Sequence, residues 1–144
     1  MTAHIFVDTN VLIYALDPVD PKKHAAARAW RTNLWNSQKG RVSFQVLQEF
    51  YAKVSQKWPS LREEARAEVR ELLAWRPVPV NAGLLETAWK TQDRFQLSFW
   101  DSLIVAAARS ASCDYLLTED LQSGQDLDGI LVVNPFSSDP ASFL

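Results

Sequence analysis

The stretch HIFVDTNVLIYAL, residues 4–16, predicts the first strand and helix of the chain and raises the first question about function. It begins with a run of strand-forming apolar residues, which stops at Asp8 and is followed by Thr9 and Asn10. A carboxylate where a strand leaves the core is unfavourable unless something pairs with it. Asp8 is therefore either the cap of a following helix or part of a site.

Composition limits the class of protein. The chain has 144 residues, of which 47% are hydrophobic, enough for one core and too few for two, so we expect residues 1–144 to form a single domain. The lone Cys113 cannot form an internal disulfide, and no apolar run approaches the ~18 residues of a membrane span. The start of the chain lacks the features of a signal peptide. We expect a soluble, cytoplasmic protein without a membrane segment.

Charge is divided unevenly along the chain. The net charge is −2, but residues 1–60 hold eight Lys or Arg against four Asp or Glu, whereas residues 61–144 hold seven against thirteen. This split permits a basic face beside an acidic one, but such a split most often reflects differently solvated surfaces.

Strand-like and helical segments alternate along the sequence. We expect strands at residues 4–8, 40–45, 114–118 and 130–133, an edge strand at 77–80, and helices at 10–16, 21–36, 46–58, 60–75, 82–95 and 99–111. The predicted helix caps are Asp20, Asn81, Ser98 and a capping box of Ser60 with Glu63. The alternation predicts an α/β fold with a mostly parallel sheet, and the helices between residues 46 and 75 form a hairpin.

Two acids are predicted to lie at the carboxyl edge of this sheet. Ligands of parallel open sheets bind beyond the carboxyl ends of the strands. Asp8 ends the first strand and Asp120 follows residues 114–118, so both point into that crevice if their strands are neighbours. Taken alone, Asp8 is explained as a helix cap and Asp120 as a turn residue.

Two further acids interrupt apolar helices. Glu49 borders the apolar stripe of helix 46–58, and Asp101 lies in the first turn of the most apolar helix of the chain. Taken alone, Glu49 is explained as a solvated helix edge, and Asp101 as the partner of Ser98 in a capping box. These local explanations stay open at this point.

Four acids that share one pocket would need a cation to offset their negative charge. Carboxylates that share a pocket repel one another, and no Lys or Arg stands next to all four in the sequence. Mg²⁺ or Mn²⁺ suits such an oxygen-only set, whereas zinc suits it less, because His4 and His24 are not spaced as a ligand pair. Such a site favours hydrolysis of a phosphate ester, with Asp120 or Glu49 orienting or deprotonating the attacking water.

Five segments resemble a known family, in its order and spacing, over essentially the whole chain. They are IFVDTNVLIY (5–14), VLQEFY (46–51), FWDSLIVAAA (99–108), LLTEDL (116–121) and VVNPF (132–136). They resemble the PIN domain, in particular the short stand-alone toxins of VapC type. The resemblance implies a three-layer α/β/α sandwich with a small, mostly parallel sheet and a helical hairpin at about 46–75.

The resemblance also implies an activity and a site. It implies a Mg²⁺- or Mn²⁺-dependent endoribonuclease whose catalytic and metal-binding acids are Asp8, Glu49, Asp101 and Asp120, supported by Asn10 and Thr118. Glu119, Asp126 and Asp128 lie close to the fourth position in the sequence, and whether any of them assists is open. Family members are usually toxins that cut structured cellular RNA, are silenced by a small antitoxin, and commonly form homodimers.

Contacts with partners are expected from three further groups of residues. The candidates for RNA phosphate contacts are Lys22, Lys23, Arg28, Arg31, Lys39, Arg41, Lys53 and Lys57, each of which also fits an ordinary solvated face. The tryptophans Trp30, Trp35, Trp58, Trp75, Trp89 and Trp100 are expected mostly in the core or a dimer interface, with base stacking the minor alternative. Leu47, Tyr51 and Leu61 on the hairpin are candidates for holding an antitoxin helix.

Two other functions are compatible with the sequence. One is a phosphatase that forms an aspartyl-phosphate at Asp8, disfavoured because such enzymes resemble a D-x-D start and position 10 is Asn. The other is a module of the same fold that binds RNA or protein without cleaving it, disfavoured because the acidic set is complete.

Overall fold

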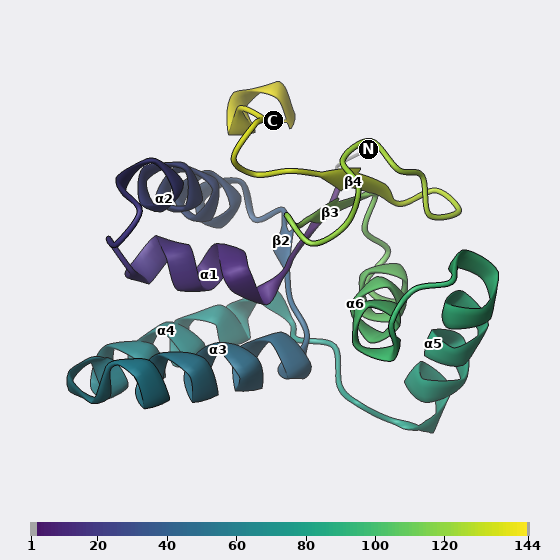
Figure 1. The fold of residues 1–144 in the computed structure, drawn as a ribbon, viewed down its shortest axis with the longest axis horizontal. Coiled ribbons are helices and arrows are strands. Elements are labelled where there is room, and N and C mark those ends of the chain that lie inside the picture. Colours follow the sequence, from purple (N-terminus) through teal and green to yellow (C-terminus); the bar gives the residue numbers. More distant parts are fainter. Residues whose placement is uncertain (1–2, 144) are drawn as a thin grey trace.

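The fold is a small parallel sheet with helices on both sides, seen in a computed structural model that describes residues 3–143 (Figure 1). The strands are β1 (Ile5–Val7), β2 (Gly40–Arg41), β3 (Tyr115–Leu117) and β4 (Leu131–Val133). The helices are α1 (Thr9–Leu16), α2 (Pro21–Ser37), α3 (Phe44–Lys57), α4 (Arg62–Leu72), α5 (Ala82–Phe95) and α6 (Phe99–Ser110). Short 3-10 turns lie at Pro59–Leu61, Leu73–Trp75 and Pro140–Phe143.

The sheet has the order β2-β1-β3-β4, and each neighbouring pair is parallel. In β1, Ile5 pairs with Gly40 of β2 and with Tyr115 of β3. This confirms the predicted α/β fold with its parallel sheet. Because β1 and β3 are neighbours, the residues that follow them leave the sheet at the same edge.

Helices form the outer layers of the sandwich. In Figure 1, α1 to α4 lie on one side of the sheet, and α5 and α6 lie on the other. The helix α6 is buried continuously from Ser102 to Ala108, which confirms the expected central helix. Phe6 in β1 and Leu116 in β3 are fully buried, so the core lies between the sheet and these helices. The three-layer α/β/α arrangement is thereby confirmed.

Side-chain caps start several helices as predicted. Asp20, Asn81 and Ser98 each accept a hydrogen bond from the backbone N–H three residues later, in Lys23, Leu84 and Asp101. Such caps satisfy amide groups that have no partner within the helix. They fix the first residue of α2, α5 and α6.

Three predicted boundaries were wrong. The strand expected at 40–45 ends at Arg41, because the hydroxyl of Ser43 accepts from the N–H of Val46 and α3 begins at Phe44. The capping box at Ser60 is absent: a 3-10 turn occupies this position, and α4 begins after Leu61 without a side-chain cap. The edge strand expected at 77–80 is reduced to a single bridge between Val78 and Ser43.

The tryptophans divide into two groups. Trp30 and Trp75 are buried, and Trp35 and Trp58 pack against the core, as expected. Trp89 is 47% exposed and Trp100 is 64% exposed, so neither belongs to the core of this chain. Among the described helices, none is both long and apolar enough to cross a bilayer.

Candidate active site

Asp8 lies where β1 turns into α1. Its carboxylate caps the helix by accepting from the N–H of Thr9 at 2.7 Å, and accepts from the hydroxyl of Thr118 at 2.8 Å. The side chain is buried, with 7% of its surface exposed. Both explanations offered by the sequence therefore apply at once, because Asp8 is a helix cap and also faces a polar pocket.

Thr118 and Asn10 connect Asp8 with Asp120. Besides donating to Asp8, the Thr118 hydroxyl accepts from the N–H of Asp120 at 3.1 Å. The amide Nδ2 of Asn10 is 3.4 Å from both carboxylate oxygens of Asp120. The two polar residues chosen from the sequence thus hold the ends of β1 and β3 together.

Glu49 reaches the same place from α3. One of its oxygens accepts from the hydroxyl of Thr9 at 3.2 Å, and the other accepts from Nε2 of Gln45 at 3.0 Å. Gln45 precedes Glu49 by four residues and lies on the same helix face. The start of α3, fixed by Ser43, therefore decides where this carboxylate lies.

Asp101 approaches from the opposite side of the sheet, in the first turn of α6. Its N–H donates to the capping hydroxyl of Ser98 at 3.1 Å. The side chain is half-buried. Its pKa is raised mainly by burial, a shift that the hydrogen bond with Ser98 opposes and the charges of Asp120 and Glu49 increase.

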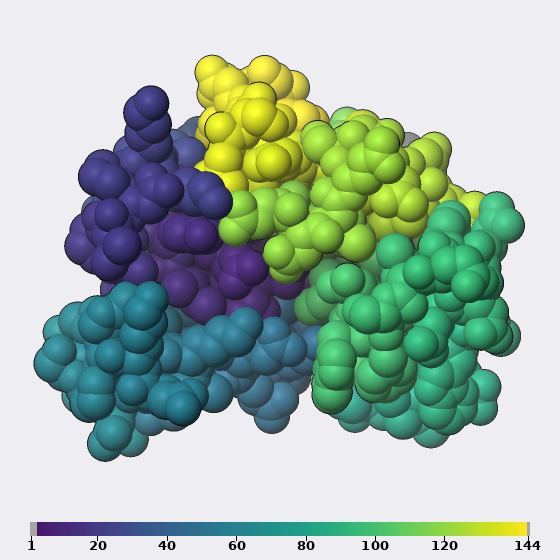
Figure 2. Space-filling model, in the orientation of Figure 1, coloured from purple at the N-terminus to yellow at the C-terminus, as the bar shows by residue number. Residues whose placement is uncertain are grey.

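The four acids line one pocket of about 60 Å³, space for a few water-sized groups. Its other lining residues are Thr9, Asn10, Gln45, Lys53, Trp100 and Ile104. Figure 2 shows the amino-terminal segment, in purple, set back between the blue-green surface of α3 and α4 and the green surface of α5 and α6. The pocket is thus built from segments far apart in the sequence.

The acids interact through space. Burial is the largest cause that raises the pKa of Asp8, to about 6; the hydrogen bonds from Thr118 and Thr9 act against it, and the charges of Asp120 and Glu49 add to it. Asp120 and Glu49 raise the pKa of Asp101 as well. The pocket therefore holds excess negative charge that makes it favourable for a cation.

The donor set fits a hard divalent cation. Asp8, Glu49, Asp101 and Asp120 offer only oxygen atoms, and Lys53 is the one basic residue among the lining residues. Within residues 3–143, no three Asp, Glu, His or Cys side chains are already gathered tightly enough to enclose an ion. The four carboxylates line the wall of the pocket, and a Mg²⁺ held by only some of them would keep several of its waters.

The three acids that lie close to Asp120 in the sequence form contacts elsewhere in the fold. Glu119 forms an ion pair with Lys23 at 2.9 Å, and Asp128 forms one with Arg94 at 2.6 Å. Asp126 accepts from the N–H of Gly129 within its own loop. None of these three acids lines the pocket.

Four residues that line the pocket were not assigned to it from the sequence. Thr9 and Gln45 were not selected, although the DTN motif and the spacing of four from Glu49 were available signals. Lys53 was one of eight basic residues predicted to contact RNA phosphates, and of these eight it alone lines the pocket. Trp100 was expected in the core or a dimer interface; it lies outside the core of this chain and is exposed beside Asp101.

Two of the other basic candidates are already neutralised. Lys23 pairs with Glu119, and Arg31 pairs with Glu68 and Glu71. Their charges are therefore compensated within the fold.

Comparisons with solved structures find toxins of similar architecture. The VapC20 toxin of Mycobacterium tuberculosis, described as cleaving the sarcin-ricin loop, is 26% identical with a TM-score of 0.62; the match covers 81% of this chain and 91% of that one. A toxin–antitoxin complex from Klebsiella pneumoniae is 20% identical with a TM-score of 0.65, over 92% of this chain and 98% of that one.

Comparison with protein families gives a match over most of the chain. A separate comparison with curated protein sequences finds no match. The PIN domain matches residues 5–123, a range that contains β1 to β3, all six helices and all four acids of the pocket. The chain therefore belongs to the PIN domain family.

Proposed function

We propose that this protein is a Mg²⁺- or Mn²⁺-dependent endoribonuclease that hydrolyses RNA phosphodiester bonds and acts as the toxin of a toxin–antitoxin pair. The observation that carries the proposal is the gathering of Asp8, Glu49, Asp101 and Asp120, from four separate segments, around one small pocket. Membership of the PIN domain family and similarity to VapC20, described as a sarcin-ricin loop cleaving toxin, support it.

The same four carboxylates would hold the cation. When bound, a divalent ion supplies compensating positive charge and a Lewis acid for phosphate oxygens. Asp8 is the most firmly placed ligand, because Thr9 and Thr118 both donate to it and it is almost fully buried. Thr118 and Asn10 act as positioning residues, since each bonds to carboxylates from the ends of β1 or β3.

Asp120 is the best candidate to orient the attacking water. It is exposed, and its side-chain contacts with Asn10 are long at 3.4 Å, whereas Glu49 accepts shorter bonds from Thr9 and Gln45. A carboxylate with free lone pairs can accept a proton as water attacks phosphorus and the bond to the leaving ribose oxygen breaks.

Two exposed residues of the pocket suit a nucleic-acid substrate. Lys53 is one turn beyond Glu49 on α3 and places an ammonium group beside the acids, where it can contact a phosphate. Trp100 presents an indole that is 64% exposed next to Asp101, a surface on which an unpaired base can stack. Together they favour RNA over a small phosphate monoester.

The proposal includes a partner and an assembly. Leu47 and Tyr51 line an apolar groove between α3 and α4, which we assign to a helix of the antitoxin, and the Klebsiella pneumoniae complex supports such a partner. Leu61, also expected there, does not line that groove. We further propose that residues 1–144 act as one nuclease domain, as a homodimer, in the cytoplasm.

The activity is tested with purified protein, freed of any partner, incubated with Mn²⁺ and a panel of structured RNAs. We expect cleavage that a chelator abolishes and that Asp8→Asn or Asp101→Asn reduces by about 100-fold or more, because each change removes charge from the cation site. Asp93→Asn, on the exposed side of α5, removes the same charge elsewhere and is the matched control.

Different outcomes identify the alternatives. If the panel stays uncut, the non-cleaving RNA- or protein-binding module replaces the nuclease. If Asp8→Asn and Asp101→Asn both retain full cleavage, the site assignment is wrong. A trapped acyl phosphate on Asp8 would instead establish the phosphatase, against which Asn10 speaks because its amide faces Asp120.

A further inference from the structure

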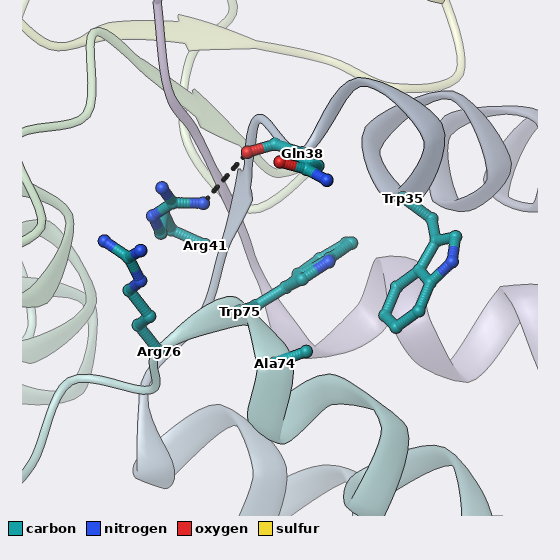
Figure 3. A pocket seen from close by; sticks show the side chains of 6 residues that line it. All are labelled: Trp35, Gln38, Arg41, Ala74, Trp75 and Arg76. Carbon is teal, nitrogen blue, oxygen red and sulfur yellow. Dashed lines mark hydrogen bonds between the residues drawn. The ribbon is translucent and has the colours of Figure 1, made fainter.

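A second pocket lies away from the acids, beside the edge strand β2 (Figure 3). It has a volume of about 330 Å³ and is lined by Trp35, Gln38, Arg41, Ala74, Trp75 and Arg76. These residues come from the end of α2, from β2 and from the 3-10 turn after α4. The size is that of a small-ligand pocket, and the lining contains two guanidinium groups and no carboxylate.

Arg41 is held in place while keeping donors free. Its Nη1 donates to the backbone oxygens of Gln38 at 3.1 Å and Gly40 at 2.7 Å, and its Nη2 lies 3.3 Å from Nε2 of His4. A guanidinium has five N–H groups. Two of these remain without a partner among residues 3–143.

Arg76 has no structural role that explains it. Its side chain forms no hydrogen bond and no ion pair within the described part of the chain, and it is exposed. Its backbone has φ of 55°, at the end of the 3-10 turn, where the left-handed conformation favours glycine. Gln38 and Gln96 have the same backbone conformation at the ends of α2 and α5, so what distinguishes Arg76 is its guanidinium, which has no partner within residues 3–143 and lines the pocket.

Neither arginine of this pocket forms an ion pair within residues 3–143. Arg31, which lies over the rings of Trp35 and Trp75, pairs instead with Glu68 and Glu71.

The two arginines also act on the neighbouring His4. Burial is the largest cause that lowers its pKa, and the charges of Arg41 and Arg76 lower it further, against an opposing effect of Asp114. Asp114 forms no ion pair with either arginine within residues 3–143.

We propose that Arg41 and Arg76 bind a phosphate group in this pocket, carried by the RNA backbone or by a free nucleotide. Guanidinium groups match phosphate oxygens with paired hydrogen bonds. The indole of Trp75 packs against the backbone of Gly40, where an added Cβ would come within 2.6 Å of it, so this ring forms a fixed wall of the pocket.

This site is separate from the proposed nuclease centre. Arg41 contacts His4 at the amino end of β1, whereas Asp8 follows the carboxyl end, about 13 Å further along an extended chain. A phosphate here leaves the reaction centre free, so the site adds affinity for RNA or senses nucleotides without taking part in cleavage.

The test measures binding and does not depend on cleavage. Inorganic phosphate and AMP are titrated by calorimetry into the full chain carrying Asp8→Asn, without divalent cations, so that the acid pocket does not contribute. Arg76→Gln should weaken phosphate binding about tenfold or more, the loss expected for a charged hydrogen-bonding partner. Arg62→Gln, which removes an exposed arginine outside both pockets, is the matched control and should have no effect.

The source of the phosphate is separated by a second arm with an intact structured RNA. If the RNA backbone is the ligand, Arg76→Gln lowers RNA affinity and reduces the slope of log affinity against log salt by about one relative to Arg62→Gln. If a free nucleotide is the ligand, only phosphate and AMP binding fall. Equal binding by both variants in every titration, with thermal unfolding showing both folded, overturns the proposal, and it does so whether or not the protein cuts RNA.

Discussion

Asp8 has two opposing effects on the stability of the fold. As a helix cap it stabilises α1, and as a buried carboxylate beside Asp120 and Glu49 it destabilises the fold when ionised. Its pKa of about 6 lies above the ordinary value of 3.8. The folded chain therefore binds more protons than the unfolded chain between these two values, and this group's contribution to stability falls as pH rises through that window.

We therefore expect Asp8→Asn to stabilise the apoprotein at neutral pH. Asparagine keeps the helix cap, since Asn and Asp are equally good caps, and removes the buried charge. In a chelator at pH 7.5 the free energy of unfolding should rise by about 2 to 3 kcal/mol, and at pH 4 the two proteins should be nearly equal.

Urea unfolding at the two pH values measures this effect. Asp93→Asn, at an exposed position of α5, should show no such pH-dependent difference. An Asp8→Asn protein that is less stable than the parent at pH 7.5 would mean that the buried carboxylate gains more from its hydrogen bonds than it loses by burial.

At the scale of single elements, the caps decide where functional side chains lie. Ser98 begins α6 and thereby fixes Asp101 and Trp100 in its first turn. Because the body of α6 is buried, the helix stays in place even when its first turn loosens.

Ser98→Ala should therefore affect the site more than the fold. We expect a loss of about 1 kcal/mol in unfolding free energy from the missing cap. RNA cleavage and Mn²⁺ affinity should fall severalfold, measured by single-turnover kinetics and calorimetry. Ser98→Thr keeps a capping hydroxyl and should restore both, whereas unchanged Mn²⁺ affinity in Ser98→Ala would show that the cap does not position Asp101.

The first residue of a helix could be predicted from the sequence where one local signal dominated. Asp20, Asn81 and Ser98 are caps directly before apolar periodicity, and the structure confirms all three. The predicted start at Ser60 failed because Pro59 favours a 3-10 turn ahead of the helix, which leaves the serine inside that turn. Ser43 was overlooked as a cap because the β-prone residues around it suggested a continuing strand.

At the scale of the whole molecule, the sequence predicted the part of the site that depends on strand order. A parallel sheet places Asp8 and the segment of Asp120 at one edge once β1 and β3 are neighbours. Thr9 and Gln45 could not be selected in this way, because their role depends on how α3 packs against α1. The exposed position of Trp100 likewise follows from the packing of α6, which apolar character alone does not predict.

Cation binding should stabilise the whole fold, because it relieves repulsion among acids that belong to four segments. At a Mn²⁺ concentration about 100 times Kd, the parent protein should gain about 2.7 kcal/mol in unfolding free energy. Calorimetric melting with and without Mn²⁺ measures the gain. Asp8→Asn should lose most of it and Asp93→Asn should keep it; equal gains in both variants would place the ion outside this pocket.

The hydrogen bond between Thr118 and Asp8 joins residues 110 positions apart, and it has a consequence for protein synthesis. A nascent chain that has left the ribosome only as far as α5 contains Asp8 and Glu49 but neither Asp101 nor β3, the strand that pairs with β1. At ~5–20 residues per second, Asp120 follows Asp8 after about 6 to 22 s. The pocket is therefore incomplete throughout most of translation, and the ribosome that makes this proposed nuclease is not exposed to it until the last quarter of the chain emerges.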